Sequence, residues 1–455
     1  MRRLTRRSFL ASSALAVAAG PAFGAPRPVP VPEVPRSGWV DAVVVGAGAA
    51  GIAAGRRLAA AGKRFVVLEA ADEVGGRCIT DSKTFGMPYD RGAHWIFAAD
   101  INPLAKLAMQ VGLDVYPAPP GQRMRIGRRY AREGEMEDFL SSLVRANSAI
   151  ADAARKSDVS CVQALPKELG EWRPTIEFVL GPYGCSKDLS EVSTADLARS
   201  GERDNNAFCR QGYGTLLARL AAPLPLLLST PVKTIEWWSR ARIEVETTKG
   251  QFKTGLVILT VSTNVLTSGK LKLAPDLPKR HLEAATKLKL GSRDHVALEL
   301  TGNPLGLRSD ELVLEKAGGR QTAAIFGNMS GSTICVIDIG GNFGRDLSAK
   351  GEAAMIDFAI NWLGGLYGTD MKGAVKRRHA TRWNSEPWVL GAVSAAAPGA
   401  QSSRRILAEP LSNRIFLAGE ATHETLWGTV NGAWESGERA ADTVVKLLGG
   451  PSKRG

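Results

Sequence analysis

Residues 39–70 read WVDAVVVGAGAAGIAAGRRLAAAGKRFVVLEA. The run from Val43 to Val45 is typical of a parallel strand that is buried on both faces. Gly46, Gly48 and Gly51 follow with GxGxxG spacing. The first glycine permits a tight turn, the second lets the backbone approach a pyrophosphate, and the third lets a helix pack on the strand. The stretch therefore predicts a strand, a glycine turn and an alanine-rich helix.

A second apolar strand, Phe65 to Leu68, ends in an acid, Glu69. That carboxylate is placed to accept hydrogen bonds from both hydroxyls of an adenosine ribose, and its charge disfavours a 2′-phosphate. The order of strand, glycine turn, helix, strand and acid predicts a dinucleotide-binding unit.

Two later segments favour FAD over NAD as the dinucleotide. A second glycine turn, Gly75-Gly76-Arg77, lies just past the second strand, and YDRGAHW follows at residues 89–95. A plain nicotinamide enzyme has no need for that second turn. Here the chain resembles the flavin-containing amine oxidase family, in which the acid is followed by GGR and then by a D-x-G-A-x-W segment. The resemblance implies that the GGR backbone and Arg77 contact the pyrophosphate, whereas a surface salt bridge is the alternative for Arg77.

The resemblance continues to the far end of the chain. QGYGTLLARLA at residues 211–221 and the strand-rich block after it match the middle of the family, where the backbone beside Val232 meets the adenine. RIFLAGEATHETLWGTVNGAWESGERAADTVV at residues 414–445 matches the C-terminal block. The family pattern implies that Glu420 accepts a hydrogen bond from a ribityl hydroxyl. A helix from about Thr429 would point its free N–H groups at the flavin.

The implied fold class is α/β, with a GxGxxG-type, Rossmann-like FAD-binding domain interleaved with an α+β substrate domain. We expect the FAD-binding domain from residues 38–97, 205–268 and 378–450, and the substrate domain from residues 98–204 and 269–377. Residues 115–200 are weakly patterned. The expected FAD-binding residues are Gly46, Gly48, Ala49, Ala50, Gly51, Glu69, Ala70, Gly75, Gly76, Arg77, Gly92, Ala93, His94, Trp95, Val232, Gly419, Glu420, Thr429 and Val430.

Amine oxidation by a flavin moves a hydride equivalent from the carbon beside nitrogen to flavin N5, and water hydrolyses the resulting imine. The amine must be neutral although its free pKa is ~10, so a dry aromatic pocket helps. Trp383, in TRWNSEPWVLGAVSAAAPG, matches the family tryptophan that packs beside the isoalloxazine. An ordinary core tryptophan is the alternative.

The chain also departs from the family pattern. Ala392 stands where members with covalent flavin carry a cysteine, so the FAD should be non-covalent. Val393 and Thr429 stand where monoamine oxidases place two tyrosines, so that aromatic cage is absent. Phe97 replaces a glutamate or histidine of some polyamine oxidases, and Trp95 replaces an arginine of L-amino acid oxidases. None of these three subclasses is favoured.

The most consequential departure is His295. The segment GSRDHV at residues 291–296 resembles the family's G-x-x-x-K-V, whose lysine holds a water near flavin N5 and is tied to oxygen reactivity. An imidazole titrates near pH ~6.5 and lacks a permanent charge. The hypothesis is that His295 holds the water or acts as a base, with slow reoxidation by oxygen and a quinone or protein as a possible acceptor. The alternative is a partly exposed histidine at a strand start.

The N-terminus, MRRLTRRSFLASSALAVAAGPAFGA at residues 1–25, reads as a signal peptide. Its apolar run, Phe9 to Gly20, is too short for a membrane span, which needs ~20 residues. TRRSFL resembles the twin-arginine signal, so we expect passage through that translocon in folded form and a periplasmic location. An ordinary secretory signal is the alternative. Residues 26–37 read as a proline-rich linker.

Composition narrows the function classes. The 455 residues carry a formal charge of +13. The five arginines of RMRIGRRYAR, residues 123–132, favour a solvated hairpin over a nucleic-acid site. The five cysteines are scattered and show no CxxC and no metal spacing. At least one must stay unpaired within a monomer, so we expect that no disulfide framework holds this fold.

The leading functional hypothesis is an FAD-dependent oxidase or dehydrogenase of a primary or secondary amine, giving imine or aldehyde and, with oxygen, hydrogen peroxide. Two alternatives stay open. One is a flavoprotein of the same fold that dehydrogenates a non-amine, as a desaturase does. The other is a flavin-binding protein with little catalysis.

Overall fold

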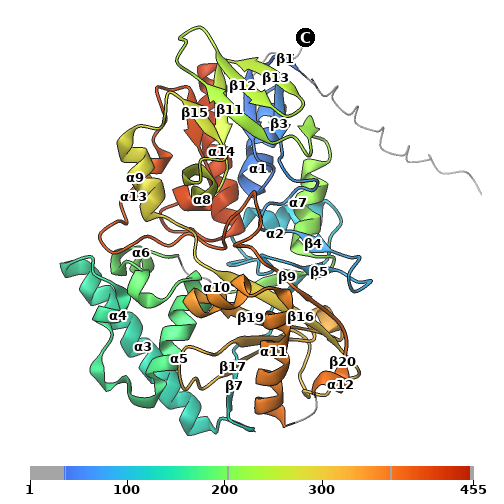
Figure 1. Ribbon diagram of the computed structural model, residues 1–455, viewed down its shortest axis with the longest axis vertical. Coiled ribbons are helices and arrows are strands. Elements are labelled where there is room, and N and C mark those ends of the chain that lie inside the picture. The colour runs from blue at the N-terminus through green and yellow to red at the C-terminus, as the bar shows by residue number, and fades with distance from the viewer. Residues whose placement is uncertain (1–34, 36, 202–203, 369–370, 451–455) are drawn as a thin grey trace, which may run out of the picture. The chain divides into compact units, whose positions relative to one another are not determined.

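The computed structural model describes residues 35, 37–201, 204–368 and 371–450. The expected signal peptide and most of the expected linker lie outside these residues. Within them, two five-stranded sheets and one seven-stranded sheet contain most of the strands. Figure 1 shows the two smaller sheets with α1 and α14 in its upper part and the larger sheet with α11 in its lower part.

The glycine-rich N-terminal stretch folds into the centre of a parallel sheet, as predicted. Its strand order is β10 (Leu226–Leu227), β3 (Phe65–Leu68), β2 (Ala42–Val45), β14 (Leu256–Leu259) and β21 (Ile415–Leu417). All neighbours in this sheet run parallel. Every residue of β2 is buried, because Val44 faces one hydrophobic cluster and Val43 and Val45 face another.

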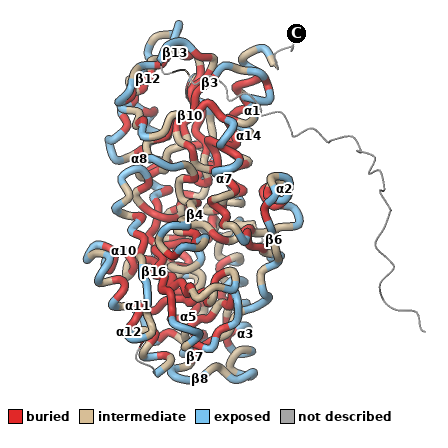
Figure 2. Tube along the Cα trace, turned by 90° about the vertical axis from the view of Figure 1, so that its right-hand side faces the viewer, coloured by how far each residue is buried: buried red, intermediate tan, exposed pale blue. Residues whose placement is uncertain are grey.

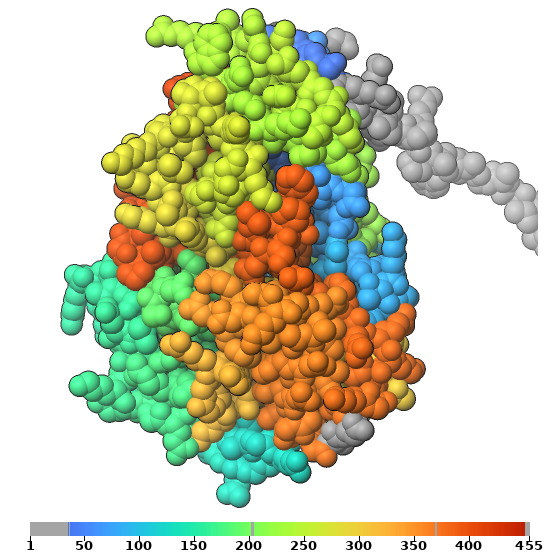
Figure 3. Space-filling model, viewed as in Figure 1, coloured from blue at the N-terminus to red at the C-terminus, as the bar shows by residue number. Residues whose placement is uncertain are grey.

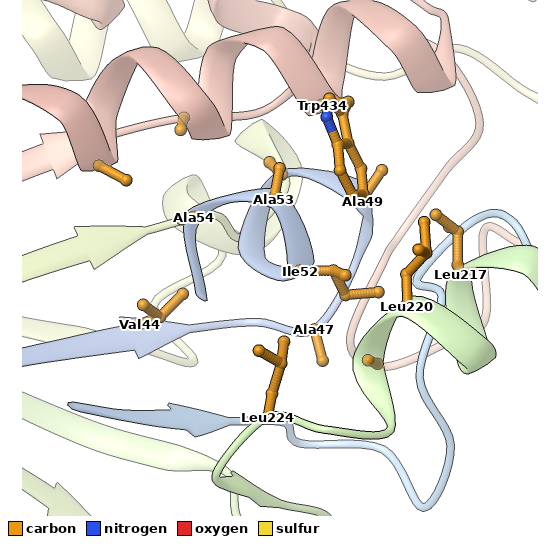
Figure 4. Packing of buried hydrophobic residues seen from close by; sticks show 14 of the residues in the cluster. Val44, Ala47, Ala49, Ile52, Ala53, Ala54, Leu217, Leu220, Leu224 and Trp434 are labelled. Atoms are coloured by element: carbon orange, nitrogen blue, oxygen red, sulfur yellow. The ribbon is translucent and has the colours of Figure 1, made fainter. Parts of the chain in front are cut away.

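Helices cover one face of the parallel sheet. They are α1 (Ala49–Ala60), α7 (Tyr213–Ala221) and α14 (Val430–Leu447). A Cβ on Gly437 would lie 2.0 Å from the carbonyl oxygen of Ala50, so α14 contacts α1 backbone to backbone. Figure 4 shows Trp434 of α14, Ile52 of α1 and Leu220 of α7 in this packing.

A second sheet and three short helices cover the other face. The sheet order is β1 (Gly38–Trp39), β13 (Gly250–Thr254), β12 (Ile243–Thr247), β11 (Val232–Glu236) and β15 (Lys272–Ala274). The helices are α8 (Thr263–Thr267), α9 (Lys279–Lys287) and α13 (Ser403–Ala408). Stretches far apart in the sequence therefore lie side by side, as the blue, green-to-yellow and orange-to-red segments in the upper part of Figure 3 show.

The seven-stranded sheet has the order β20 (Val375–Ala380), β16 (Arg293–Leu300), β19 (Ile334–Gly340), β18 (Ala324–Gly327), β17 (Glu311–Glu315), β7 (Arg123–Ile126) and β8 (Arg129–Tyr130). Side chains alternate between its faces. Val296, Leu298 and Ile337 face a cluster that includes α11 (Glu352–Tyr367), beside α10 (Gly341–Ala349) and α12 (Met371–Ala374). Ala297 and Val336 face the opposite side.

The weakly patterned stretch contains a helix that the sequence did not reveal. α3 (Glu133–Lys156) buries one face, including Phe139, Ala146 and Ile150, and exposes the other. The buried positions recur three or four residues apart, and Figure 2 shows exposed chain, in pale blue, beside the label α3. The same stretch also contains α4 (Cys161–Ala164), α5 (Arg173–Phe178), α6 (Thr194–Ala198) and the short turns η1 (Lys167–Trp172), η2 (Val179–Tyr183) and η3 (Leu189–Glu191).

The remaining elements are short. Strand β4 (Thr80–Asp81) pairs with β5 (Tyr89–Asp90), and β6 (Val115–Pro117) pairs with β9 (Ala207–Cys209). Helix α2 (Pro103–Gln110) and the turns η4 (Met329–Gly331) and η5 (Glu420–Thr422) complete the described chain.

The arginine-rich segment forms the hairpin β7–β8, as predicted. Its arginines are engaged rather than gathered into a free basic patch: Arg123 pairs with Glu311, and Arg129 pairs with Glu135. Arg125 is buried and donates to the Leu366 carbonyl.

All five cysteines are buried free thiols, as expected of a fold without a disulfide framework. None of the helices in the described residues has both the length and the apolar character that a membrane crossing requires. Nor do three or more His, Cys, Asp or Glu side chains gather into a possible metal site within that part of the chain.

Candidate functional site

One cavity of about 590 Å³ runs along the carboxyl ends of β2 and β3 and under the seven-stranded sheet. That size is ordinary for a cofactor or ligand site. All of the predicted cofactor and catalytic residues except Gly51 line it, including Trp383 and His295. Gly51 has the packing role expected of the third glycine, since a Cβ there would lie 1.8 Å from the Gly46 carbonyl oxygen.

The two glycine turns meet at this cavity. Gly48 forms an isolated bridge with Gly75, and Gly75 has a φ of +117° that side-chain-bearing residues rarely adopt. Gly48 is also the N-cap of α1, and no side chain caps that helix. The first-turn N–H groups of α1 therefore stay available to an anionic ligand.

Glu69 ends β3 at the same place and is buried. Its Oε2 accepts from Ala47 N at 2.6 Å, and its Oε1 accepts from Ala71 N at 2.9 Å. Burial raises the pKa of Glu69, although these backbone N–H groups offset part of the rise. Each carboxylate oxygen can accept a second hydrogen bond, which is what two ribose hydroxyls would supply.

Arg77 and Glu420 bring the N-terminal and C-terminal motifs together. Arg77 Nη1 donates to Glu420 Oε1 at 2.9 Å and also to the Ala392 carbonyl. Glu420 Oε2 accepts from Ser394 Oγ at 2.6 Å and from Gly428 N at 2.8 Å. The ion pair is thus inside the cofactor cavity, not on the surface.

Trp383 forms part of the cavity wall. Its backbone N–H donates to Asp294 Oδ1 at 2.8 Å, and its indole Nε1 donates to the Arg91 carbonyl at 3.3 Å. A Cβ on Gly92 would lie 3.2 Å from the Trp383 ring, so the tryptophan packs on the Gly92 segment.

His295 stands on β16 directly opposite Asp338 on β19. His295 Nε2 lies 3.0 Å from Asp338 Oδ1, and Arg293 Nη2 donates to Asp338 Oδ2 at 3.0 Å. Burial alone would raise the pKa of Asp338, but Arg293 and His295 outweigh it and hold that pKa far below its usual value. His295 is buried rather than partly exposed.

A group of aromatic side chains lines the cavity. The rings of Trp95 and Phe97 lie parallel, 6.4 Å between centroids, and Phe326 meets Trp95 edge to face at 5.7 Å. Val393 and Thr429, which stand where monoamine oxidases place two tyrosines, also line the cavity, and Trp95, Phe97 and Phe326 give it an aromatic wall.

The family model for flavin-containing amine oxidoreductases matches residues 49–445. The chain belongs to that family. Its cofactor is FAD, and the amine oxidase fold expected from the sequence is confirmed.

Curated relatives include mouse lysine-specific histone demethylase 1B, 27% identical over 442 residues that cover 89% of this chain and 52% of that protein. Lysine-specific histone demethylase 1 homolog 2 of Arabidopsis thaliana is 27% identical over 464 residues, covering 92% and 60%. The chain therefore spans about half to three fifths of the length of these relatives.

Solved structures of similar fold include cyclohexylamine oxidase from Brevibacterium oxydans IH-35A, with a TM-score of 0.74 and 19% identity over 90% of this chain and 99% of that one. Wild-type putrescine oxidase bound to putrescine gives a TM-score of 0.75 and 20% identity, with 90% and 99% coverage. At this identity the likeness shows the shared fold.

The residues of the cavity fit FAD. Two glycine turns leave room for a pyrophosphate beside the uncapped N-terminus of α1, and Glu69 keeps acceptor capacity for a ribose. Ala392 lines the cavity, and its methyl group cannot form the covalent bond to flavin that a cysteine could form, which agrees with non-covalent binding.

Sequence reasoning missed part of the cavity wall. Asp338, Phe326, Val336, Met329 and His379 all line it. Their roles depend on strand pairing in the seven-stranded sheet, which no local motif encodes.

Proposed function

We propose that the chain oxidises the C–N bond of a small primary or secondary amine with an apolar substituent. FAD, when bound, supplies the acceptor for the hydride equivalent that leaves the carbon beside nitrogen. The observation that carries the proposal is one continuous cavity that holds both the dinucleotide motifs and an apolar aromatic chamber with the paired Asp338 and His295 at its wall.

In this proposal the aromatic wall keeps water away from the substrate amine. Trp95, Phe97, Phe326 and Met329 exclude water from the chamber. A dry wall disfavours the ammonium form of the substrate and so favours the neutral amine that can be oxidised. Trp383, held by Asp294 and the Arg91 carbonyl, gives one side of the chamber a fixed flat surface.

The acid that the seven-stranded sheet contributes to the cavity is already paired, which supports a small monoamine over a polycation. A long polyamine or a lysine-bearing basic peptide calls for free acids to pair its extra positive charges. Asp338, on the chamber face of the sheet, already binds Arg293 and His295. Asp100, the nearest acid after Phe97 in sequence, is exposed. The relatives named as histone demethylases therefore support the type of reaction, oxidation of an amine, but not a histone-like substrate for this chain.

Anaerobic photometric titration of the FAD-loaded protein tests this proposal. The panel contains cyclohexylamine, benzylamine, putrescine, a dimethyl-lysine peptide and a non-amine donor such as a cyclic ketone. Loss of flavin absorption with the two apolar monoamines at the lowest concentrations is the expected result. Reduction only by putrescine or the peptide would overturn the substrate class. Reduction only by the ketone, or by nothing in the panel, would overturn amine oxidation.

We also propose that the protein is exported folded, through the twin-arginine translocon, to the periplasm, and that oxygen or a quinone or protein takes the electrons there. The basic, apolar and small-residue order of residues 1–25 supports the route. FAD is made in the cytoplasm and would be held inside a buried cavity, so the chain should fold around it before export.

A further inference from the structure

A line of three charged or titratable side chains crosses two strands at the cavity wall: Asp338 and His295, which are buried, and Arg293, which is partly exposed. The register pairs His295 with Asp338 and Arg293 with Gly340, so the three side chains project from the same face of the sheet. Asp338 Oδ2 accepts a hydrogen bond from Arg293 Nη2 at 3.0 Å, and Asp338 Oδ1 lies 3.0 Å from His295 Nε2. Arg293 is fixed in turn, because its Nη1 donates to the Tyr183 carbonyl at 2.8 Å.

The backbone of His295 is also fixed. Its N–H donates to Thr381 Oγ1 at 2.9 Å, and its carbonyl accepts from Thr381 N at 3.0 Å. The backbone of His295 is therefore held in register opposite Asp338.

An ionised carboxylate can only accept hydrogen bonds. Asp338 is held ionised by Arg293, so the proton of the neutral His295 ring must be on Nε2. A second proton would go to Nδ1, which is buried and has no hydrogen-bond partner among the described residues. Burial opposes that second proton and the charge of Asp338 favours it.

We propose that Asp338 is the positioning residue for His295: it holds the ring at the cavity wall, fixes the proton of the neutral ring on Nε2 and favours the protonated form of the ring. This inference rests on the proposed amine oxidation for its kinetic consequences, but its structural part does not. The cluster has a net charge of zero when the ring is neutral and of plus one when the ring is protonated.

Other ionisable groups face this part of the sheet. They are Asp294 on β16, His379 on β20, Arg382 just after β20, Glu352 at the start of α11, and Tyr183 in η2. Burial lowers the pKa of His379 and raises that of Tyr183 to about 12, so neither carries charge near neutral pH. Glu352 is engaged by Ala380 N, and Asp294 by Thr381 and Trp383.

A switchable charge at this wall acts in opposite directions on the two halves of the reaction. A positive ring repels an ammonium and disfavours the positive charge that develops on the substrate as it is oxidised, so substrate oxidation should quicken as the ring loses its proton. The same positive ring favours negative charge formed when oxygen is reduced, so reoxidation should slow over the same pH interval.

The direct test is nitrogen NMR of the FAD-loaded protein labelled in its histidine rings. The chain has five histidines, and His295→Gln identifies the signal to follow. We expect a neutral His295 ring protonated on Nε2, and a midpoint that falls by roughly one to two pH units in Asp338→Asn. Asp310→Asn, which removes a buried acid bound to Tyr116 and Ser330, is the matched control and should leave the midpoint unchanged.

A neutral ring protonated on Nδ1 in the wild type overturns the proposal without any need for a variant that folds. An unchanged midpoint in folded Asp338→Asn overturns it as well.

The kinetic test separates this inference from the proposed function. Protein reduced with dithionite is mixed with oxygen at a series of pH values, which requires no amine substrate. Reoxidation should slow as pH rises, and its midpoint should move down in Asp338→Asn together with the NMR midpoint. If an amine reduces the flavin, that rate should rise with pH about the same midpoint. The role of Asp338 is contradicted if the NMR and reoxidation midpoints differ, or if they stay unchanged in Asp338→Asn. If no amine reduces the flavin, only the proposed function is contradicted.

Discussion

Arg77 donates to Glu420 at 2.9 Å although the two residues are 343 positions apart. Arg77 follows the second glycine turn and Glu420 follows β21, so their ion pair joins the first and last motifs of the cofactor site. Burial alone would raise the pKa of Glu420, but Arg77 and Arg404 outweigh it and lower that pKa. The carboxylate is therefore charged and held in place by the protein itself.

Replacing Glu69 with Gln should weaken FAD binding by about 10- to 100-fold, equivalent to roughly 1.5–3 kcal/mol, because ribose hydroxyls lose a charged acceptor. Gln is preferred to Ala because its carbonyl can still accept from Ala47 or Ala71. Titration of the apoprotein with FAD measures the change. Glu246→Gln, at an exposed position of β12, is the control. Equal affinities in wild type and Glu69→Gln would remove Glu69 from the ribose site.

Replacing Gly51 with Ala should destabilise the protein by more than about 3 kcal/mol and release FAD, because the new methyl group would lie 1.8 Å from the Gly46 carbonyl oxygen. The matched variant is Gly134→Ala in the first turn of α3, where a Cβ meets nothing within 4 Å. That change should be neutral or stabilise by up to ~1 kcal/mol. Urea unfolding of both variants gives the comparison, and a mild effect at Gly51 would mean that α1 can move away from the turn.

The sequence predicted those parts of the site that a continuous segment encodes. Residues 42–69 fold as expected into the strand β2, the helix α1 and the strand β3. The helix expected from about Thr429 has that residue as its N-cap. In these segments turn chemistry, capping and periodicity act within a few residues of one another.

The rest of the site depends on contacts between distant strands. His295 was identified, but its partner Asp338 was not, because the pairing follows from the register of β16 with β19. α3 was also missed: its buried face is interrupted by Ser142, which blurs the apolar periodicity. Pairings of this kind are decided by how the sheets and helices pack.

Burial of Lys187 should make the free energy of unfolding rise with pH in the alkaline range. Burial lowers the pKa of Lys187 to about 8, and its Nζ donates to the Ala395 carbonyl at 2.7 Å. The unfolded chain, with a lysine pKa of ~10.4, therefore binds more protons than the native state between pH 8 and 10, so this residue makes stability rise with pH across that interval. The contribution is roughly 3 kcal/mol over the whole interval. Lys187→Met should unfold with a flatter dependence on pH than the wild type; parallel curves would contradict this.

Substituting Lys for both Arg6 and Arg7 should block export while keeping the charge of the signal region. The precursor should then accumulate in the cytoplasm with FAD bound, as fractionation and flavin fluorescence would show. Lys for Arg2 and Arg3 is the control, because those residues lie outside the TRRSFL segment. Normal periplasmic yield from the first double variant would point to the general secretory route.

Arg404 and Asp196 form a fully buried ion pair that reaches the cofactor site. Arg404 Nε and Nη2 donate to the two Asp196 oxygens at 2.6 and 2.7 Å, and both side chains are 0% exposed. Arg404 Nη1 also donates to Ser394 Oγ at 3.1 Å, and that hydroxyl donates to Glu420. α6 is thereby connected to the carboxylate beside Arg77.

Arg404→Met should cost about 3–5 kcal/mol of unfolding free energy, because it leaves Asp196 as an uncompensated buried charge. Adding Asp196→Asn should recover much of that loss, since the amide carbonyl can still accept from Ala396 N and no charge is left unpaired. FAD affinity should not recover in the double variant, because Glu420 still lacks the second cation that keeps it ionised, and the deficit should be largest at acid pH. Urea unfolding and FAD titration at two pH values measure the two effects separately. A double variant that regains both stability and FAD affinity would show that Arg404 only balances Asp196 and does not act on Glu420.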